Sequence, residues 1–322
     1  MEHTIDTVRK LYPEQINTYC KTLIKEHPEL SGMYCADIRE LENPRGLKAD
    51  GLGEMPLSPF PHLIRTYKDR ALLLTTGNCF SRCRFCFRKR IWSTDGEIMQ
   101  EPSDDELDAI TVWLKGHPEI TDILLSGGDV MTLSDDRILS LIHRLKSTGT
   151  IETFRICSRA PAVQPDRITD KIAAELGNIE GVWFVCHFNH PAELTPAAEE
   201  ACRKLVSHGV PVLNQTVLLA GINDDAETLT KLFKHLARIR VKPHYLFHID
   251  PVEGVSHFAT GVQKGLEIMN TFRDTLSSIA RPDFAIDLPN GGGKVVLTPD
   301  CCAPDGSYWS AVLKKYLKHP LA

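Results

Sequence analysis

The sequence predicts an α/β protein, a partial (β/α)6 barrel of the TIM-like type, and two observations support this fold class. From Ala71 onward, short apolar runs rich in β-branched and aromatic residues alternate with amphipathic stretches of helical period, which is the pattern of parallel βαβ units. With 322 residues, of which 42% are hydrophobic and 25% charged, the chain can also bury a core of barrel size. We expect the strands near residues 71–76, 122–126, 153–158, 182–188, 210–219 and 242–250.

Helix signals between these runs agree with the barrel. Ser103 and Glu106 have the spacing of a capping box, and Thr195-Pro196 supplies an N-cap followed by proline at the first helical position. Barrel enzymes place their chemistry in the loops after the strands. The unusual residues expected at those strand ends are therefore the candidates for function.

Three regions are expected along the chain. Residues 1–66 combine helical pattern with a passage rich in proline and glycine, which predicts an N-terminal helical extension. The barrel is expected to span residues 67–280, and residues 281–322 are expected to form a short C-terminal segment.

Composition and charge narrow the function. The formal net charge of -5 and the pI near 6.2 leave no basic stripe for a polyanion, so we expect a small-molecule substrate and no nucleic acid partner. The N-terminus lacks a positive region followed by an apolar run, and no apolar stretch is long enough to span a membrane. We therefore expect a cytoplasmic protein, in which ten cysteines indicate metal or cluster binding rather than disulfides.

The strongest chemical signal is the loop after the first expected strand. It holds Cys79, Cys83 and Cys86 in the spacing C-x3-C-x2-C. Four thiolates would fill a [4Fe–4S] cluster or a structural zinc site, whereas three leave one iron open to an exogenous ligand. A zinc knuckle with a fourth ligand from elsewhere is the alternative, and Cys157 and Cys186, in apolar runs, are expected to be core packing. The spacing is similar to that of the radical SAM superfamily, whose open iron binds S-adenosylmethionine.

Polar or glycine-rich groups recur at the ends of later strands. Ser126-Gly127-Gly128-Asp129 follows the second strand, and paired glycines there would let the backbone approach a ligand. His187-Phe188-Asn189-His190 comes at the end of the fourth strand, and Asn214-Gln215 lies in the fifth. Each of these alone is more often a satisfied structural group. Their recurrence favours S-adenosylmethionine contacts from Ser126, Gly127, Gly128, Asp129, His187 and Gln215.

Together with Tyr67-Lys68-Asp69-Arg70, Arg88-Lys89-Arg90 and the late passage Asp287-Leu288-Pro289-Asn290-Gly291-Gly292-Gly293-Lys294, these motifs resemble the lysine 2,3-aminomutase family from about Tyr67 to Pro299. The resemblance implies a radical SAM barrel whose C-terminal segment binds pyridoxal 5′-phosphate. It assigns the pyridoxal lysine to Lys294, with help from Tyr67 and Arg70. Read without the family, the glycines before Lys294 could be a flexible loop, and the P-loop pattern fails because no Ser or Thr follows this lysine.

The resemblance also implies the substrate site. Arg88 would bind the substrate carboxylate, for which a guanidinium fork is well suited. Asp250 and Asp287 occupy the positions of the two carboxylates that recognise the substrate side chain in the lysine-specific family. A lone aspartate is more often a cap or a surface charge.

The implied reaction is a radical SAM 2,3-aminomutation, L-lysine to β-lysine, that uses a [4Fe–4S] cluster, S-adenosyl-L-methionine and pyridoxal phosphate. The expected partners are a small-molecule amino acid substrate and an electron donor such as flavodoxin or ferredoxin, and a homo-oligomer is left open. Longer family members end in a cysteine-rich zinc segment, whereas here only Cys301-Cys302 stand near the end, so we expect no structural zinc. The alternatives are an enzyme of the elongation factor P modification type, an aminomutase of another amino acid, a radical SAM methylthiotransferase, or a non-catalytic iron–sulfur or zinc module.

Overall fold

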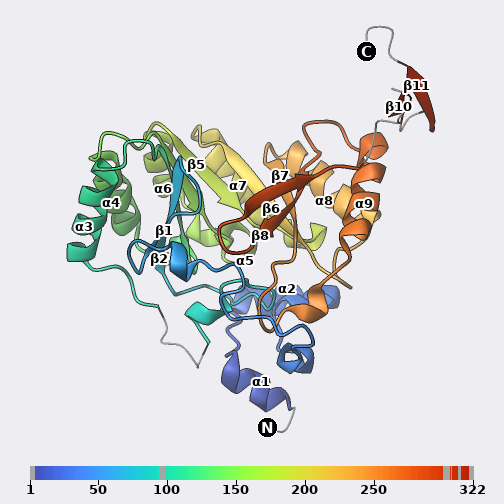
Figure 1. Ribbon diagram of the computed structural model, residues 1–322, viewed down its shortest axis with the longest axis horizontal. Helices are drawn as coiled ribbons and strands as arrows, with labels where there is room; N and C mark the ends of the chain where they lie inside the picture. The colour runs from blue at the N-terminus through green and yellow to red at the C-terminus, as the bar shows by residue number, and fades with distance from the viewer. Residues whose placement is uncertain (1–3, 94–98, 300–304, 306, 311–312, 319–322) are drawn as a thin grey trace.

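The computed structural model describes residues 4–93, 99–299, 305, 307–310 and 313–318, and its centre is a curved sheet of nine strands in sequence order (Figure 1). Neighbouring strands from β2 to β8 are parallel, and antiparallel β1 and β9 form the two edges, so the barrel stays open. The strands are β1 (Leu63–Ile64), β2 (Arg70–Thr76), β3 (Asp122–Gly127), β4 (Thr153–Cys157), β5 (Val182–Cys186), β6 (Val212–Leu218), β7 (Lys242–His248), β8 (Asp283–Leu288) and β9 (Gly293–Leu297).

The six predicted strands are confirmed as β2 to β7; β2 and β3 are one residue longer than predicted, and β4 to β7 are shorter. Ser158, His187 and Asp250 therefore lie just beyond their strands, in the loops where function was expected. The sheet also continues beyond the prediction, because β8 pairs in parallel with β7 and β9 folds back on β8. The pyridoxal lysine predicted from the family is thus on an edge strand of the barrel sheet itself.

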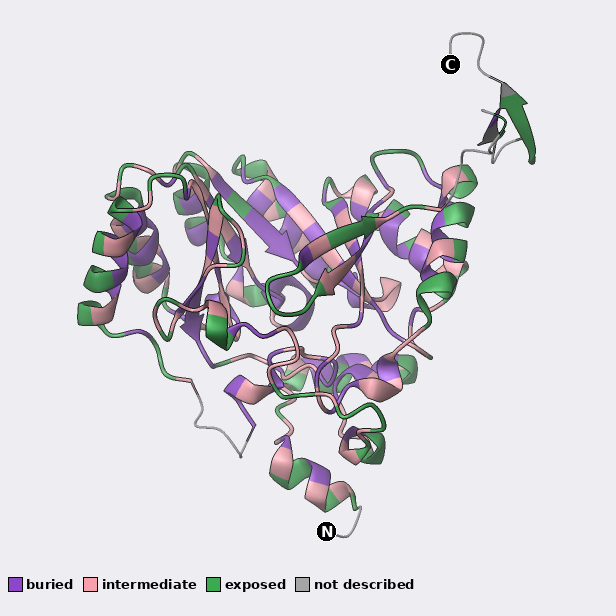
Figure 2. Ribbon diagram, in the orientation of Figure 1, coloured by how far each residue is buried: buried purple, intermediate pink, exposed green. Residues whose placement is uncertain are grey.

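Amphipathic helices cover the outer face of the sheet (Figures 1 and 2). In α8, for example, Leu229, Leu232, Phe233 and Leu236 are fully buried, which is the i, i+3, i+4, i+7 stripe of a helix lying on a core. The helices are α1 (Ile5–Leu11), α2 (Thr18–Glu26), α3 (Asp104–Lys115), α4 (Asp135–Lys146), α5 (Ala160–Val163), α6 (Asp170–Gly177), α7 (Pro196–Ser207), α8 (Ala226–Arg238) and α9 (Val262–Thr275). Within the described part of the chain, no helix combines the length and apolarity that crossing a membrane requires.

The predicted helix starts are found, with one difference. Thr195 caps α7 by accepting a hydrogen bond from Ala198 N, and Pro196 follows it. Ser103 caps α3 by accepting from Glu106 N at 3.1 Å. The Glu106 carboxylate, however, accepts hydrogen bonds from the His62 backbone and ring rather than closing a capping box, because the edge strand β1 brings His62 next to it.

The N-terminal extension packs beneath the sheet, against the loop that carries the three cysteines. Arg84 N donates to the Met33 carbonyl at 2.9 Å, and Arg82 N donates to the Gln15 carbonyl at 2.9 Å. Figure 1 places α1 and α2 on this side of the molecule. The extension therefore supports the cysteine loop directly.

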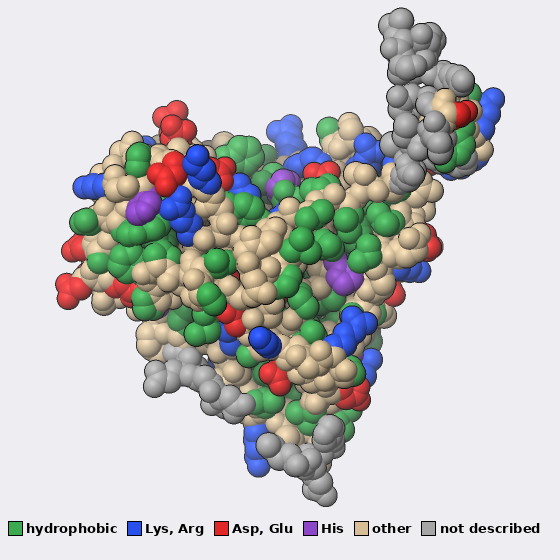
Figure 3. Space-filling model, in the orientation of Figure 1, with side chains coloured by type: hydrophobic (Ala, Val, Ile, Leu, Met, Phe, Trp, Pro, Cys, Tyr) green, Lys and Arg blue, Asp and Glu red, His purple; other side chains and the backbone are tan. Residues whose placement is uncertain are grey.

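The β8–β9 hairpin lies on the face shown in Figure 3, where exposed hydrophobic side chains of Leu288, Val295 and Val296 gather. Further along the chain, a two-stranded hairpin of β10 (Ser307–Ser310) and β11 (Lys315–Lys318) lies apart from the barrel. Cys301 and Cys302, for which we expected no zinc site, are outside the described residues.

Replacing Gly265 by alanine should lower the free energy of unfolding by about 1–3 kcal/mol in urea denaturation. A Cβ at Gly265, in α9, would lie 2.2 Å from Cζ of Phe284, a fully buried ring of β8 that has no room to retreat. Gly261→Ala is the matched control, because a Cβ there meets open space; Gly261 is the N-cap of α9, where alanine is disfavoured, so this variant should lose less than about 1 kcal/mol. Equal losses in the two variants would contradict the packing of α9 on β8.

Candidate active site

A cavity of about 530 Å³ opens at the C-terminal ends of the parallel strands, a volume within the usual range of ligand sites. Parallel strands direct their C-terminal loops to one mouth, which brings residues from distant parts of the sequence together. Every residue that the sequence analysis assigned to a site lines this cavity: Tyr67, Arg70, Cys79, Cys83, Cys86, Arg88, Ser126, Gly127, Gly128, Asp129, His187, Gln215, Asp250, Asp287 and Lys294.

The cysteine loop is fixed by a buried group of charges. The Arg84 guanidinium binds the Glu40 carboxylate with two hydrogen bonds of 2.8 and 2.6 Å, and Lys89 Nζ donates to the same carboxylate at 2.6 Å. Arg84 and Glu40 are fully buried, so these charge-assisted bonds form away from water and would be costly to break. Residues of the N-terminal extension thus hold the loop between its second and third cysteines.

The three thiols face the cavity from a largely dry environment. Burial raises the pKa of the Cys83 thiol to about 11, and burial likewise raises the pKa values of Cys79 and Cys86. No three His, Cys, Asp or Glu side chains in the described ranges are arranged to hold one metal ion. In a [4Fe–4S] cluster each thiolate binds a different iron, so cluster ligands do not have to converge on a single point.

The two glycines after β3 allow a close backbone contact. Gly127 has a φ of +118°, and a Cβ there would lie 2.6 Å from the Thr76 carbonyl oxygen. A Cβ at Gly128 would lie 2.2 Å from the Asn78 carbonyl oxygen. We expected this pair to let the backbone approach a ligand, and the structure shows that it also lets β3 approach the start of the cysteine loop.

Asp129 and His187 are held firmly at the cavity wall. The Asp129 carboxylate accepts hydrogen bonds from Ser158 Oγ at 2.7 Å and from the backbone N–H groups of Arg159 and Met131. Asn189 Oδ1 accepts from Val217 N, so His187 Nε2 donates to this oxygen at 3.1 Å and Nδ1 is left as an acceptor. Burial lowers the pKa of His187 to about 3, which keeps the ring neutral.

Asn214 and Gln215 have different roles because successive side chains of a strand point to opposite faces of the sheet. Asn214 is fully buried and exchanges hydrogen bonds with the backbone of Phe188. Gln215 points to the other side and lines the cavity. The sequence analysis assigned only Gln215 of this pair to the site, and Gln215 is the one that lines the cavity.

At the opposite end of the cavity, Lys294 pairs with Asp287. The two residues are register partners across the β8–β9 hairpin, and Lys294 Nζ donates to both Asp287 oxygens at 2.9 and 2.8 Å. Lys294 N donates to the Tyr67 hydroxyl at 2.7 Å, which ties this strand to the start of the barrel. The ammonium also lies 3.9 Å from the ring centroid of Phe247 and 5.1 Å from that of Tyr245, in cation–π geometry.

A second carboxylate, Asp250, is buried beside this pair. Burial, and then the Asp287 charge, raise the pKa of Asp250 to about 7, while the Lys294 cation acts in the opposite direction. Burial lowers the pKa of Lys294 against the attraction of Asp287 and Asp250. Two carboxylates and two aromatic rings thus surround one ammonium group.

Arg88 lies in the wall with its guanidinium oriented by other residues. Nε and Nη2 bind the carboxylate of Glu54, with contacts as short as 2.6 Å, and Nη1 donates to Ser126 Oγ at 3.2 Å. Arg90 also binds Glu54 at 2.7 Å, so two cations share this one carboxylate. Asp50 Oδ1 also lies 3.6 Å from Arg90 Nε, so two arginines are balanced by two carboxylates at this place in the wall.

Four residues with direct contacts to the site were missed in the sequence. Arg159 directly follows the third expected strand, so the strand-end rule could have found it, and Phe247 and Tyr245 could have been found by the alternation of β7. Glu54 gave no signal, because it lies in the passage read as a linker and meets Arg88 only through the fold.

Residues 73–233 match the model of the Radical SAM superfamily. The chain is also 41% identical over 310 residues to the putative L-lysine 2,3-aminomutase of Aquifex aeolicus (strain VF5). The matched region covers 93% of this chain and 81% of that protein. The chain belongs to the lysine 2,3-aminomutase family. This confirms the resemblance drawn from its motifs and the radical SAM form of its barrel.

Two further relatives of this chain in the lysine 2,3-aminomutase family are longer proteins. It is 43% identical over 251 residues to the L-lysine 2,3-aminomutase of Bacillus subtilis (strain 168), covering 78% of this chain and 53% of that protein. It is 37% identical over 259 residues to the glutamate 2,3-aminomutase of Clostridioides difficile (strain 630), covering 80% of this chain and 60% of that protein. The chain therefore spans less than two thirds of each of these relatives.

Enzymes of the lysine 2,3-aminomutase family use a [4Fe–4S] cluster, S-adenosylmethionine and pyridoxal phosphate, and the cavity fits these groups. The three half-buried thiols and the lysine amine line one and the same cavity. The cluster and S-adenosylmethionine supply a 5′-deoxyadenosyl radical, and pyridoxal phosphate carries the amino group. The protein has to position these groups and exclude water and oxygen.

Replacing any one of Cys79, Cys83 or Cys86 by alanine should leave an incomplete cluster after anaerobic reconstitution, because each supplies one thiolate to one iron. Iron and sulfide analysis, with the visible absorption of the cluster, measures the loss. Cys157→Ala is the matched control, since Cys157 also lines the cavity but lies in β4 and contacts the Arg155 carbonyl. Full iron content in a variant with all three cysteines replaced, or loss of iron in Cys157→Ala, would contradict the assignment of these three cysteines as cluster ligands.

Proposed function

We propose that this enzyme is an L-lysine 2,3-aminomutase, which moves the α-amino group of L-lysine to the β-carbon. The observation that supports the proposal best is the ammonium site formed by Asp250, Asp287 and the ring of Phe247. In the structure this site holds the ammonium of Lys294. A substrate with a terminal ammonium group matches the same surroundings.

The charges of this site favour a cation over an anion. Two carboxylates in a partly desolvated pocket attract an ammonium group strongly and repel a carboxylate. Burial is the main cause of the raised pKa of Asp250, and the Asp287 charge raises it further, whereas a cation at this place lowers it. A glutamate side chain would meet like charge here, so the proposal is lysine rather than the substrate named for the Clostridioides difficile relative.

The other end of the substrate is assigned to Arg88. Its Nε is used by Glu54, while Nη1 and Nη2 each carry a second hydrogen, fixed in the guanidinium plane, that can donate to a substrate carboxylate. Glu54 fixes the plane of this guanidinium, so the carboxylate of lysine has one orientation in which both donors reach it. Lysine is then held by a cation at one end and by two anions at the other.

The remaining residues are assigned to the cofactors. Tyr67 and Arg70 lie together, with the Arg70 guanidinium carbon 3.6 Å from the ring centroid of Tyr67, and would hold pyridoxal phosphate beside Lys294. Ser126, Gly127, Gly128, Asp129, His187 and Gln215 would hold S-adenosylmethionine, with the neutral His187 presenting an acceptor nitrogen. A one-electron donor such as flavodoxin or ferredoxin would reduce the cluster. Whether β-lysine is released or attached to an elongation factor changes the fate of the product, not the reaction.

Substrate choice should rest on Asp250 and Asp287. Charge-assisted hydrogen bonds of roughly 1.5–3 kcal/mol each predict that Asp250→Asn or Asp287→Asn lowers kcat/KM for lysine by roughly tenfold to a hundredfold. Turnover of lysine, ornithine, arginine and glutamate should be measured for the wild type and both variants under reducing, oxygen-free conditions. Wild type should prefer lysine and use glutamate poorly.

Asp283→Asn is the matched control, because Asp283 is an exposed residue of the same strand as Asp287. Bound pyridoxal phosphate should be quantified in every variant, since Asp287 also contacts Lys294. Unchanged lysine turnover in both aspartate variants, or a wild-type preference for glutamate, would reject lysine as the substrate. Either result would concern only the identity of the substrate and would not contradict a 2,3-aminomutase reaction.

A further inference from the structure

A guanidinium group contacts one of the three cysteine thiols. Arg159 directly follows β4, and its Nη1 donates to Cys83 Sγ at 2.8 Å. Its side chain is 7% exposed, so the contact is made away from water. The predicted reaction gives this arginine no role.

Several contacts fix the Arg159 guanidinium in place. Nη2 donates to Glu193 Oε1 at 2.5 Å, and Nε donates to the His187 carbonyl oxygen at 3.2 Å. The rings of Tyr34 and Phe85 lie 5.1 and 5.2 Å from the guanidinium carbon. The cation therefore has one orientation, with Nη1 directed at the sulfur of Cys83.

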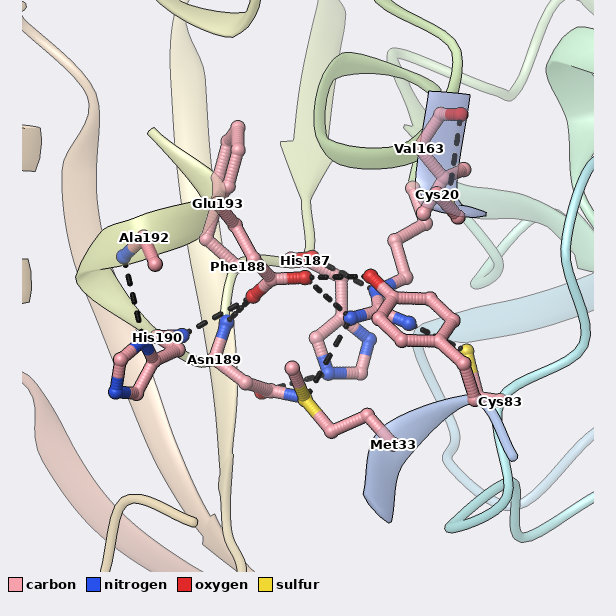
Figure 4. Close-up of polar contacts among 12 residues, drawn as sticks. Cys20, Met33, Cys83, Val163, His187, Phe188, Asn189, His190, Ala192 and Glu193 are labelled. Carbon is pink, nitrogen blue, oxygen red and sulfur yellow. Dashed lines mark hydrogen bonds and ion pairs between the residues drawn. The ribbon is translucent and has the colours of Figure 1, made fainter. Parts of the chain in front are cut away.

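Glu193 is the anchor of this arrangement, and Figure 4 shows its carboxylate between His190 and Cys83. Its side chain is fully buried and accepts from Tyr34 Oη at 2.9 Å, Asn189 N at 2.6 Å and His190 N at 3.0 Å, in addition to Arg159. Four donors from three segments hold one carboxylate. The motif His187-Phe188-Asn189-His190 thus serves the cysteine loop as well as the proposed S-adenosylmethionine site.

We propose that Arg159 is a positioning residue that raises the reduction potential of the [4Fe–4S] cluster through its hydrogen bond to Cys83. Hydrogen bonds to cluster sulfurs and nearby charge are two of the main influences on cluster potentials. Reduction adds one electron, and hence one negative charge, to the cluster without making or breaking a bond. A fixed cation at a ligand sulfur stabilises the reduced form more than the oxidised form.

The ion pair with Glu193 does not cancel this effect. The carboxylate stabilises a buried cation that would otherwise be costly to desolvate. Because Glu193 lies behind the guanidinium, the positive end of the pair is the end that meets the sulfur. The inference rests on the family's cluster and on the contacts of Arg159, and it does not depend on lysine being the substrate.

The test is an EPR-monitored redox titration of the reconstituted holoenzyme with dithionite, without amino acid substrate or S-adenosylmethionine. Arg159→Gln, which removes the charge, should lower the midpoint potential of the cluster at unchanged iron and sulfide content. Arg159→Lys, which keeps a charge but loses the fork, should give an intermediate value. The Arg159→Lys variant can still be titrated if the Arg159→Gln variant fails to hold a cluster.

The matched control is Arg82→Gln. Arg82 belongs to the cysteine loop, but its guanidinium lies over the ring of Trp92 at 5.0 Å and donates to the Pro13 carbonyl. Its removal changes net charge by the same amount, but its charge acts on Cys79 only through space, so the potential should fall by less than in Arg159→Gln. A wild-type potential in the Arg159 variants, or an equal shift in Arg82→Gln, would overturn the proposal. Weaker S-adenosylmethionine binding with an unchanged potential would do the same and would move Arg159 to that site.

Discussion

Buried and half-buried charges lie in the cavity wall and behind it, and each of them requires a partner because an unpaired ion away from water is very costly. This constraint fixes the positions of the functional groups. Glu40 and Glu54 belong to the N-terminal extension and pair with Arg84 of the cysteine loop and with Arg88, the proposed carboxylate-binding residue. Glu193 follows β5 and pairs with Arg159, whose guanidinium contacts the Cys83 thiol. The pairs are Glu40 with Arg84 and Lys89, Glu54 with Arg88 and Arg90, Glu193 with Arg159, and Asp287 with Lys294.

In one of these pairs, Asp287 with Lys294, a substrate ammonium could take the place of the lysine ammonium. Lys294 and Asp287 face each other across a hairpin, and both stand beside the proposed substrate site. While Lys294 carried pyridoxal phosphate, before a substrate displaced it, the Asp287 carboxylate would be available to a substrate ammonium. The same two anions that surround the free lysine side chain would then meet the incoming substrate. This double use would explain why the proposed specificity residue Asp287 lies opposite the proposed cofactor lysine.

The sequence predicted the strands β2 to β7 and the residues at their ends, because short apolar runs, and the residues that follow them, can be recognised in the local sequence. It did not predict β8 as a barrel strand, since residues 283–288 gain their place only by pairing with β7. Glu54 and Glu193 could not be found for a related reason. Each is a single acidic residue in a loop, and its role comes from an arginine distant in the sequence.

The central claim is that Lys294 carries pyridoxal phosphate in the cavity that also receives lysine. Borohydride reduction of the holoenzyme, followed by digestion and mass spectrometry, should place the pyridoxyl mass on the peptide that contains Lys294. Saturation with L-lysine before reduction should move that mass to free lysine and leave Lys294 unlabelled. A pyridoxyl group on another lysine of the chain, or one that stays on Lys294 when lysine is present, would contradict the account.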